Sequence, residues 1–235
     1  MKRECKQPRG TRERILEAAT EVFAAKGFRS ATVGEICRKA RANIAAVNYH
    51  FGSKAALYRE AWRHAHQAML KAFPPDGGVS PDAPPAKRLR GRIRSMLQRA
   101  ISAEGLEFRI MAHEVANPTG LLGQVFQDNI RPLTQATADI VAELLGGRAD
   151  DLAVRLCATS VIGPCMQVLH RQRMHAQEGM KPWFGEDLLE TLVDHFTTFA
   201  LAGIREVRRQ IEEQARGRPG RPDGAAATDM KAGIP

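Results

Sequence analysis

The chain has 235 residues, of which 43% are hydrophobic, so it can bury a sizeable core and is not expected to be disordered as a whole. Its 35 Lys and Arg outnumber its 26 Asp and Glu, and the resulting formal charge of +9 favours anionic partners. The first 60 residues hold thirteen basic and six acidic side chains and therefore carry +7 of that charge. This asymmetry is typical of a nucleic-acid-binding end joined to a nearly neutral remainder.

The sequence predicts a cytoplasmic protein with no membrane partner. No apolar run approaches the ~20 residues that a membrane-spanning helix requires, and the basic N-terminus lacks the apolar segment of a secretion signal. Four scattered cysteines, Cys5, Cys37, Cys157 and Cys165, show neither a C-x-x-C pair nor zinc-finger spacing. We expect them to be free thiols in a reducing compartment, and we expect neither a metal nor another cofactor.

Residues 1–10 are basic and polar and are expected to form a flexible arm. A helix is predicted to follow, with Thr11 as its N-cap and Gly27 at its end. Its apolar face recurs at helical spacing and comprises Ile15, Ala18, Ala19, Val22 and Phe23.

Two short helices are predicted next, joined by a tight turn. Thr32 and Glu35 have the spacing of a capping box at the start of a helix over 32–40. Arg41 and Ala42 form the turn, and Asn43 is a suitable N-cap for a helix that ends near residue 49.

The rest of the chain indicates further helices. Ser53 can cap a helix over 54–73, and the Pro- and Gly-rich segment 74–85 is predicted to be a loop. No stretch alternates with the period of a strand, so the fold class is all-α. The later helices are expected at 86–103, 105–116, 120–145, 150–176 and 185–216. The domain organisation predicted is an arm (1–10), a helix-turn-helix domain (11–60), a helical ligand-binding and dimerisation domain (61–216) and a disordered tail (217–235).

The segment from Thr32 to Tyr49 meets the needs of a helix-turn-helix. Its turn is short, its inner face is small and apolar, and the small side chains of Ala45 and Ala46 allow close approach to a DNA groove. Helix N-termini at Thr32 and Ser53 are suited to phosphate, because unpaired N–H groups and the helix dipole point there. On these grounds alone, a three-helix bundle with a solvated basic face remains an alternative.

From Arg12 to about Ala61, the sequence also resembles the DNA-binding domain of the TetR family. The resemblance rests on the segments RILEAA (14–19), FAAKGF (23–28), TVGEI (32–36), VNYHFGSK (47–54) and LY (57–58). It implies that the helix holding residues 43–49 enters the major groove and that Thr32 and Lys54 contact phosphates. By position, the DNA-binding residues implied are Thr32, Asn43, Ala45, Ala46, Asn48, Tyr49, His50 and Lys54.

This sequence departs from the family pattern at two of these places. Asn48 stands where many members have Tyr, although Asn can read adenine bidentately, and Ala42 stands where Gly is common. His50 either contacts phosphate or simply buttresses its helix.

Part of the C-terminal half resembles the CecR-like subgroup, whose members are described as drug-responsive repressors of efflux and transport genes. The resemblance rests on HEVANPT (113–119), NIRP (129–132), IVAELLG (140–146) and RLCA (155–158). It implies a small-molecule inducer. Candidate ligand residues are Arg109, Met111, His113, Glu114, Phe126, Arg131, Met166, Gln167, His170 and Phe196. The alternative for Arg131 is a structural pair with Glu114.

The helices at 150–176 and 185–211 have apolar faces wider than one stripe, and each is therefore expected to pack on two neighbours. A homodimer through these helices is predicted; the alternative is that they only close the monomer core. The sequence thus predicts a ligand-responsive repressor that acts on palindromic operator DNA in the bacterial nucleoid. The alternatives are a DNA-binding protein without small-molecule control and a transcriptional activator. An enzyme is the alternative that the sequence favours least, because no catalytic motif is present.

Overall fold

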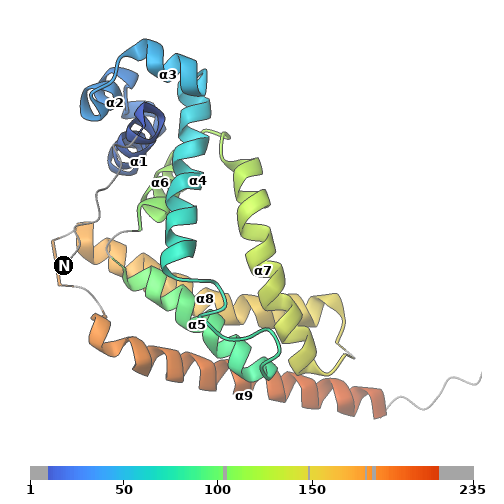
Figure 1. The fold of residues 1–235 in the computed structure, drawn as a ribbon. Helices are drawn as coiled ribbons and strands as arrows, with labels where there is room; N and C mark the ends of the chain where they lie inside the picture. The colour runs from blue at the N-terminus through green and yellow to red at the C-terminus, as the bar shows by residue number, and fades with distance from the viewer. Residues whose placement is uncertain (1–9, 103–104, 148, 178, 182–183, 217–235) are drawn as a thin grey trace, which may run out of the picture.

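A computed structural model describes residues 10–102, 105–147, 149–177, 179–181 and 184–216. The predicted arm, apart from Gly10, and the predicted tail lie outside the described residues. Throughout the described part the secondary structure is helical, which confirms the all-α fold class (Figure 1). The helices are α1 (Thr11–Ser30), α2 (Val33–Ala40), α3 (Ile44–Phe51), α4 (Lys54–Ala72), α5 (Pro85–Ile101), α6 (Leu106–Ala116), α7 (Gly123–Leu145), α8 (Asp151–Gln177), the 3₁₀ turn η1 (Glu186–Leu188) and α9 (Leu189–Arg216).

Local side-chain chemistry sets most of the helix starts near the N-terminus. Asn43 and Ser53 accept hydrogen bonds from the backbone N–H groups of the third residue beyond them, at 2.8 and 3.1 Å, and so act as the predicted N-caps. The expectation for Thr11 is wrong: α1 begins at Thr11 itself, with Gly10 as its N-cap. The Thr11 hydroxyl accepts instead from the guanidinium of Arg14 at 3.2 Å.

Gly27 interrupts α1 as predicted, because its φ of 70° is the left-handed conformation that glycine tolerates. The position also leaves little room, since a Cβ there would lie 3.1 Å from the side chain of His113 on α6. The end of α1 is therefore held directly against α6.

The hydrophobic core of the N-terminal helices continues beyond residue 60. Ala61 and Trp62 on α4, Ile110 on α6, and Leu122 and Val125 at the start of α7 belong to the same buried cluster as the apolar faces of α1 to α3. This head thus includes α6 and the first turn of α7, and its orientation depends on them.

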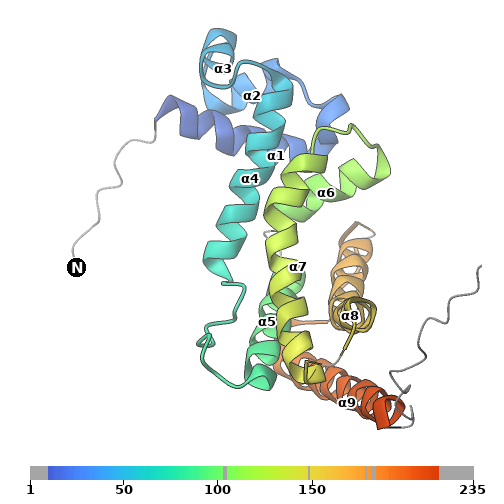
Figure 2. The ribbon, with the colours of Figure 1, turned by 90° about the vertical axis from the view of Figure 1, so that its right-hand side faces the viewer.

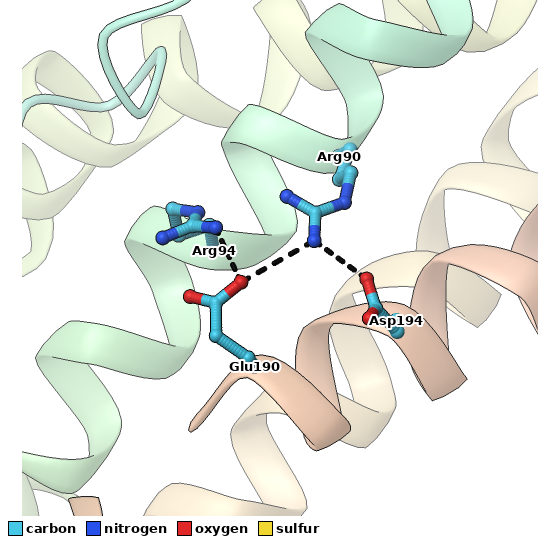
Figure 3. Close-up of polar contacts among 4 residues, drawn as sticks. All are labelled: Arg90, Arg94, Glu190 and Asp194. Carbon is cyan, nitrogen blue, oxygen red and sulfur yellow. Dashed lines mark hydrogen bonds and ion pairs between the residues drawn. The ribbon is translucent and has the colours of Figure 1, made fainter. Parts of the chain in front are cut away.

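A second core lies among α5, the latter part of α7, α8 and α9, which form the body below the head (Figures 1 and 2). Ion pairs add to the contact between α5 and α9: Arg90 reaches both Glu190 and Asp194, and Arg94 reaches Glu190 (Figure 3). These pairs are exposed, so their net contribution is about 0 to 1 kcal/mol each.

The segment between α4 and α5 is a series of turns, in agreement with the predicted loop. Its backbone rests directly on α5, because a Cβ built on Gly91 would lie 2.2 Å from the carbonyl oxygen of Asp76. Gly77 faces Gly91 in the same way and has a φ of 63°. Two glycines therefore permit the close contact between the loop and α5.

One helix corrects the membrane expectation. The stretch Asp151–Gln172 of α8, with a mean hydropathy of 1.5, is long and apolar enough to cross a membrane by length and composition alone. The charged residues Asp151, Arg155 and Arg171 lie within this stretch, so it is not an uninterrupted apolar run. Only 28% of the stretch is buried in the monomer, so an apolar face of α8 is open.

Candidate nucleic-acid interface

The short helix α3 divides into two faces. Ile44, Ala45, Asn48 and Tyr49 are exposed and follow the i, i+1, i+4, i+5 spacing that places residues on one side of a helix. Tyr49 is 85% exposed and Ile44 is 55% exposed, which is unusual for large apolar or aromatic side chains on a well-packed helix. The outward face of α3 therefore presents amide, phenol and apolar groups to solvent.

The opposite face anchors α3 to the head. Val47 and Phe51 are buried in the head core, and Ala46 is half-buried against it. The half-buried ring of His50 makes edge contacts with Tyr49 and Phe51, at centroid distances of 5.0 and 6.3 Å. Ala46 and His50 thus lie at the flanks of α3, further from the exposed face than the sequence pattern suggests.

Two other predicted contacts lie at helix starts beside α3. Thr32 is exposed and its hydroxyl accepts from the N–H of Glu35 at 3.2 Å, which confirms the N-cap. The capping box is not reciprocal, because the Glu35 carboxylate pairs with Lys26 at 2.6 Å. Both this N-terminus and the one at Ser53 are open to solvent, as an anion site at a helix start requires.

Lys54 has a contact within the head that the sequence did not reveal. Its ammonium nitrogen lies 4.6 Å from the centroid of the Phe28 ring, in a cation–π arrangement. Partial burial also lowers the pKa of Lys54. The side chain therefore helps to join the start of α4 to the end of α1, whatever it contacts beyond the protein.

The turn between α2 and α3 adds positive charge. Arg38, Lys39 and Arg41 are exposed at its edge. Arg41 adopts the left-handed conformation with φ of 49° and is the non-glycine residue with positive φ in the described chain. Its backbone N–H donates to the carbonyl oxygens of Arg38 and Cys37, which closes α2.

The predicted ligand residues are scattered. Met111 and Phe126 pack against the head core, whereas Phe196 packs in the body core. The other members lie at the surface or in contacts already made: Arg109, Arg131, Met166, Gln167 and His170 are exposed, and His113 packs at Gly27. A surface hollow of about 320 Å³ lies between α1 and α2 and involves none of them.

Glu114 belongs to a buried hydrogen-bond network within the head. Its carboxylate accepts from the Tyr58 hydroxyl at 3.2 Å, from the N–H and hydroxyl of Thr119 at 2.9 Å each, and from the N–H of Gly120 at 3.1 Å. Burial, followed by the negative charge of Glu114, raises the pKa of Tyr58. Glu114 thus ties α4 to the turn between α6 and α7; no pairing with Arg131 is found among its contacts.

Sequence reasoning missed Ile44 as an exposed residue of α3, and it missed the buried contacts of Trp62 and His66 on α4. The pattern gave no signal for Ile44, because Ile44, Val47 and Phe51 stand at i, i+3 and i+7, a spacing that predicts one shared buried face. The contacts of Trp62 and His66 involve α6 and α7, and local patterns contain no information about them.

A helix-turn-helix with an outward recognition helix on an all-helical body defines a DNA-binding transcriptional regulator. The family described as "Bacterial regulatory proteins, tetR family" matches residues 15–61, and that described as "HTH-type transcriptional dual regulator CecR, C-terminal domain" matches residues 85–204. The chain belongs to the TetR family, with a C-terminal domain of the CecR type. This family comprises regulators and not enzymes.

Curated relatives agree with this assignment. The chain is 29% identical over 113 residues to the regulator SrpR of Pseudomonas putida, which is 48% of this chain and 50% of SrpR. It is 32% identical over 110 residues to the regulator UidR of Escherichia coli K12, covering 46% of this chain and 54% of UidR. The match thus spans about half the length of these relatives.

Solved structures share the fold. A TetR-like regulator from Rhodococcus sp. RHA1 superposes with a TM-score of 0.62 at 20% identity, over 85% of this chain and 99% of that one. AibR, solved in complex with isovaleryl coenzyme A and operator DNA, superposes with a TM-score of 0.59 at 16% identity, over 81% and 97%.

Proposed function

We propose that this protein is a ligand-responsive repressor that binds palindromic operator DNA as a homodimer. The observation that carries the proposal is the exposed face of α3, which presents Ile44, Asn48 and Tyr49 to solvent. The opposite face of α3 is packed in the head core. Rigid presentation of short side chains is what base reading in the major groove requires.

Within this proposal the outward residues of α3 read bases. Asn48 is suited to adenine through its amide, and Ile44 is suited to a thymine methyl group. Asn43 and Ala45 lie at the end of α3 that enters the groove first, and half-buried Ala46 beside them permits close approach. Phosphates are contacted from the rim of this surface by Thr32, Tyr49, His50, Lys54 and the basic turn around Arg41.

The proposed dimer uses the open faces of α8 and α9. Exposed residues recur along α8 at intervals of three, four or seven positions, and they comprise Leu152, Leu156, Thr159, Met166, His170 and Met174. A parallel stripe on α9 includes His195 and Phe199, and Phe199 is 72% exposed. Two copies of these faces would form a four-helix interface with two-fold symmetry, as predicted for 150–176 and 185–211. A second copy thus accounts for the apolar face of α8 without a membrane.

Ligand response is supported by the way the head is attached. Since α6 packs on both α1 and α4, a ligand that shifts α6 would turn the head, with α4 as a lever. The related fold of AibR binds an acyl coenzyme A and operator DNA. Efflux or transport genes, as in the CecR-like subgroup, are the proposed targets, and the nucleoid is the proposed place of action.

The test is an anisotropy titration of the dimer against DNA from upstream of its own gene, with random DNA as competitor. Tyr49→Ala and Lys54→Ala should each weaken binding about tenfold or more, since each removes a direct DNA contact. Lys87→Ala, on exposed α5, is the matched control and should bind as wild type. Melting curves distinguish lost contacts from an altered head, because Lys54 also packs on Phe28.

Binding no tighter than to random DNA, at this site and at the promoters of neighbouring transport genes, would contradict the proposal. Tight binding that no small molecule relieves would favour the alternative of a DNA-binding protein without small-molecule control.

A further inference from the structure

A buried polar cluster lies where α4, α5 and α6 meet. The rings of Trp62 and His66 stack with centroids 4.8 Å apart and an interplanar angle of 14°. His66 Nδ1 lies 2.6 Å from Glu107 Oε2, and the Arg99 guanidinium donates to Glu107 Oε1 at 2.6 Å. Trp62, His66 and Glu107 are each 1% exposed and Arg99 is 7% exposed, so the cluster is sealed from solvent.

This cluster contains most of the unpaired polar atoms of the described interior. Of four buried side-chain nitrogen or oxygen atoms without a partner among the described residues, three are Trp62 Nε1, His66 Nε2 and Arg99 Nε. Leaving such a group unpaired costs about 1–3 kcal/mol, so native proteins normally pair it with protein, water or a ligand. An indole N–H and a guanidinium N–H are donors only. The group that would satisfy them must therefore be an acceptor.

The charge balance around the cluster indicates what kind of acceptor it is. Arg92, about two turns before Arg99 on the same face of α5, is 9% exposed. It donates to neutral oxygens, the Thr137 hydroxyl and the Leu133 carbonyl. Burial lowers the pKa of Arg92, Asp76 opposes that shift, and the charge of Arg99 adds to it. Of these two buried cations, Arg99 contacts a carboxylate, that of Glu107, whereas the contacts described for Arg92 are to neutral oxygens. A further anion near them would therefore be stabilised.

Aromatic rings line the approach to the cluster. Phe126 on α7 makes an edge contact with Trp62 at 4.9 Å, and the Arg99 guanidinium lies 5.4 Å from the Phe108 ring. Both phenylalanines are only partly buried. A ligand that extends from the cluster would therefore contact apolar and aromatic surface.

We infer that Trp62, His66 and Arg99 form the subsite for the anionic head of the inducer, an organic carboxylate with an apolar or aromatic body. This inference rests on the proposed ligand response and specifies the chemical class of its ligand. Trp62 Nε1 and Arg99 Nε donate to the carboxylate, and His66, held by Glu107 through Nδ1, faces it with Nε2. The body of the ligand packs on Phe126 and Phe108.

The position of the subsite explains how binding would reach the DNA. Because the cluster is closed, a carboxylate can enter only if α6 moves relative to α4 and α5. The same helix carries His113 against Gly27 of α1 and Glu114 against Tyr58 of α4. The ligand therefore selects a state in which the head is displaced.

The test is calorimetry on the full chain without DNA. The probes are acetate, benzoate, salicylate, octanoate and indole-3-acetate, each compared with its own primary amide. We expect at least one larger carboxylate to bind once per protomer, with its amide weaker by about tenfold or more because a charge-assisted contact is lost. In a Trp183→Phe background, where Trp62 is the remaining tryptophan, the same carboxylate should change the emission of Trp62.

Two variants separate a ligand contact from a structural role. Arg99→Gln should weaken carboxylate binding about tenfold or more, whereas Lys87→Gln, an exposed charge on the same helix, should leave it unchanged. Trp62→Phe keeps the ring and removes only the N–H. It should weaken the carboxylate several-fold while the melting temperature of the ligand-free protein stays the same or rises, because an unpaired donor has gone.

Three results would overturn the inference: no carboxylate binds, the amides bind equally well, or Arg99→Gln and Trp62→Phe both bind like wild type. A Trp62→Phe variant that is less stable but binds the carboxylate as tightly as the wild type would instead identify Trp62 Nε1 as the partner of an internal water. The titrations contain no DNA, so failure of operator binding leaves their outcome unaffected.

Discussion

The backbone conformation of Arg41 makes arginine less favourable than glycine at this position. It closes α2 in the left-handed conformation, with φ of 49°, at a place where a glycine is favoured. The side chain is exposed and no packing compensates for the strain. The basic charge it adds beside α3 is the property that glycine would lack.

Arg41→Gly should therefore stabilise the protein by up to about 1 kcal/mol, because relief of left-handed strain outweighs the extra freedom of the unfolded chain. Arg41→Ala keeps a Cβ and should give little or no gain. Urea unfolding followed by circular dichroism measures both. Equal stability of the Gly and Ala variants would show that the turn is not strained in solution.

The cysteines give a second prediction at the residue scale. Cys37, Cys157 and Cys165 are free and buried, and burial raises the pKa of the Cys165 thiol to about 12. Since the thiolate is the reactive form, native Cys165 should react with iodoacetamide at pH 8 only through unfolding, and far faster in urea. Peptide mass spectrometry measures the labelling. Its folded pKa lies above 9.0, so this thiol contributes stability that is lost between about pH 9 and 12.

At the scale of elements, the parts that sequence predicts well are those decided within one turn of helix. The caps at Asn43 and Ser53 depend on a side chain and an N–H three residues away, and both formed as predicted. The inward turn of Ala46, the contact of Lys54 with Phe28 and the pairing of Glu114 depend on distant helices. No local pattern specifies such contacts, and the candidate ligand residues were therefore predicted less well than the helix caps.

The loop between α4 and α5 gives a prediction at the same scale. Gly91→Ala would place a Cβ 2.2 Å from the Asp76 carbonyl oxygen, so the loop must lift from α5, at a cost of about 1–3 kcal/mol. Gly34 on α2 has open space around it and a helical position, so Gly34→Ala should be neutral or stabilising by up to about 1 kcal/mol. Thermal unfolding compares the two, and equal effects would contradict the described contact.

At the scale of the molecule, the described residues form two separate hydrophobic cores. The head core includes α6 and the start of α7, and the body core joins α5 to α9. Figure 2 shows α4 and α7 running from the head to the body, so these helices can carry a signal between the two cores. The open faces of α8 and α9 then remain for a second copy, which would set the spacing of two heads.

Paired substitution on those faces tests the dimer. Leu156→Asp together with Phe199→Asp places charges on two exposed apolar residues and should convert the dimer to a monomer with its helical content unchanged. Sedimentation velocity measures the mass. Lys87→Asp is the control surface change. A double variant that remains dimeric would place the interface elsewhere.

The most direct measurement of the central claim needs no knowledge of the target gene: selection of bound sequences by the full-length protein from a pool of random duplex DNA. We expect enrichment of an inverted repeat whose half-site centres lie about one helical turn, ~34–36 Å, apart. That enrichment should be lost when Tyr49 is replaced by Ala. Enrichment of a single unpaired site, or of no sequence at all, would contradict a dimeric operator-binding repressor.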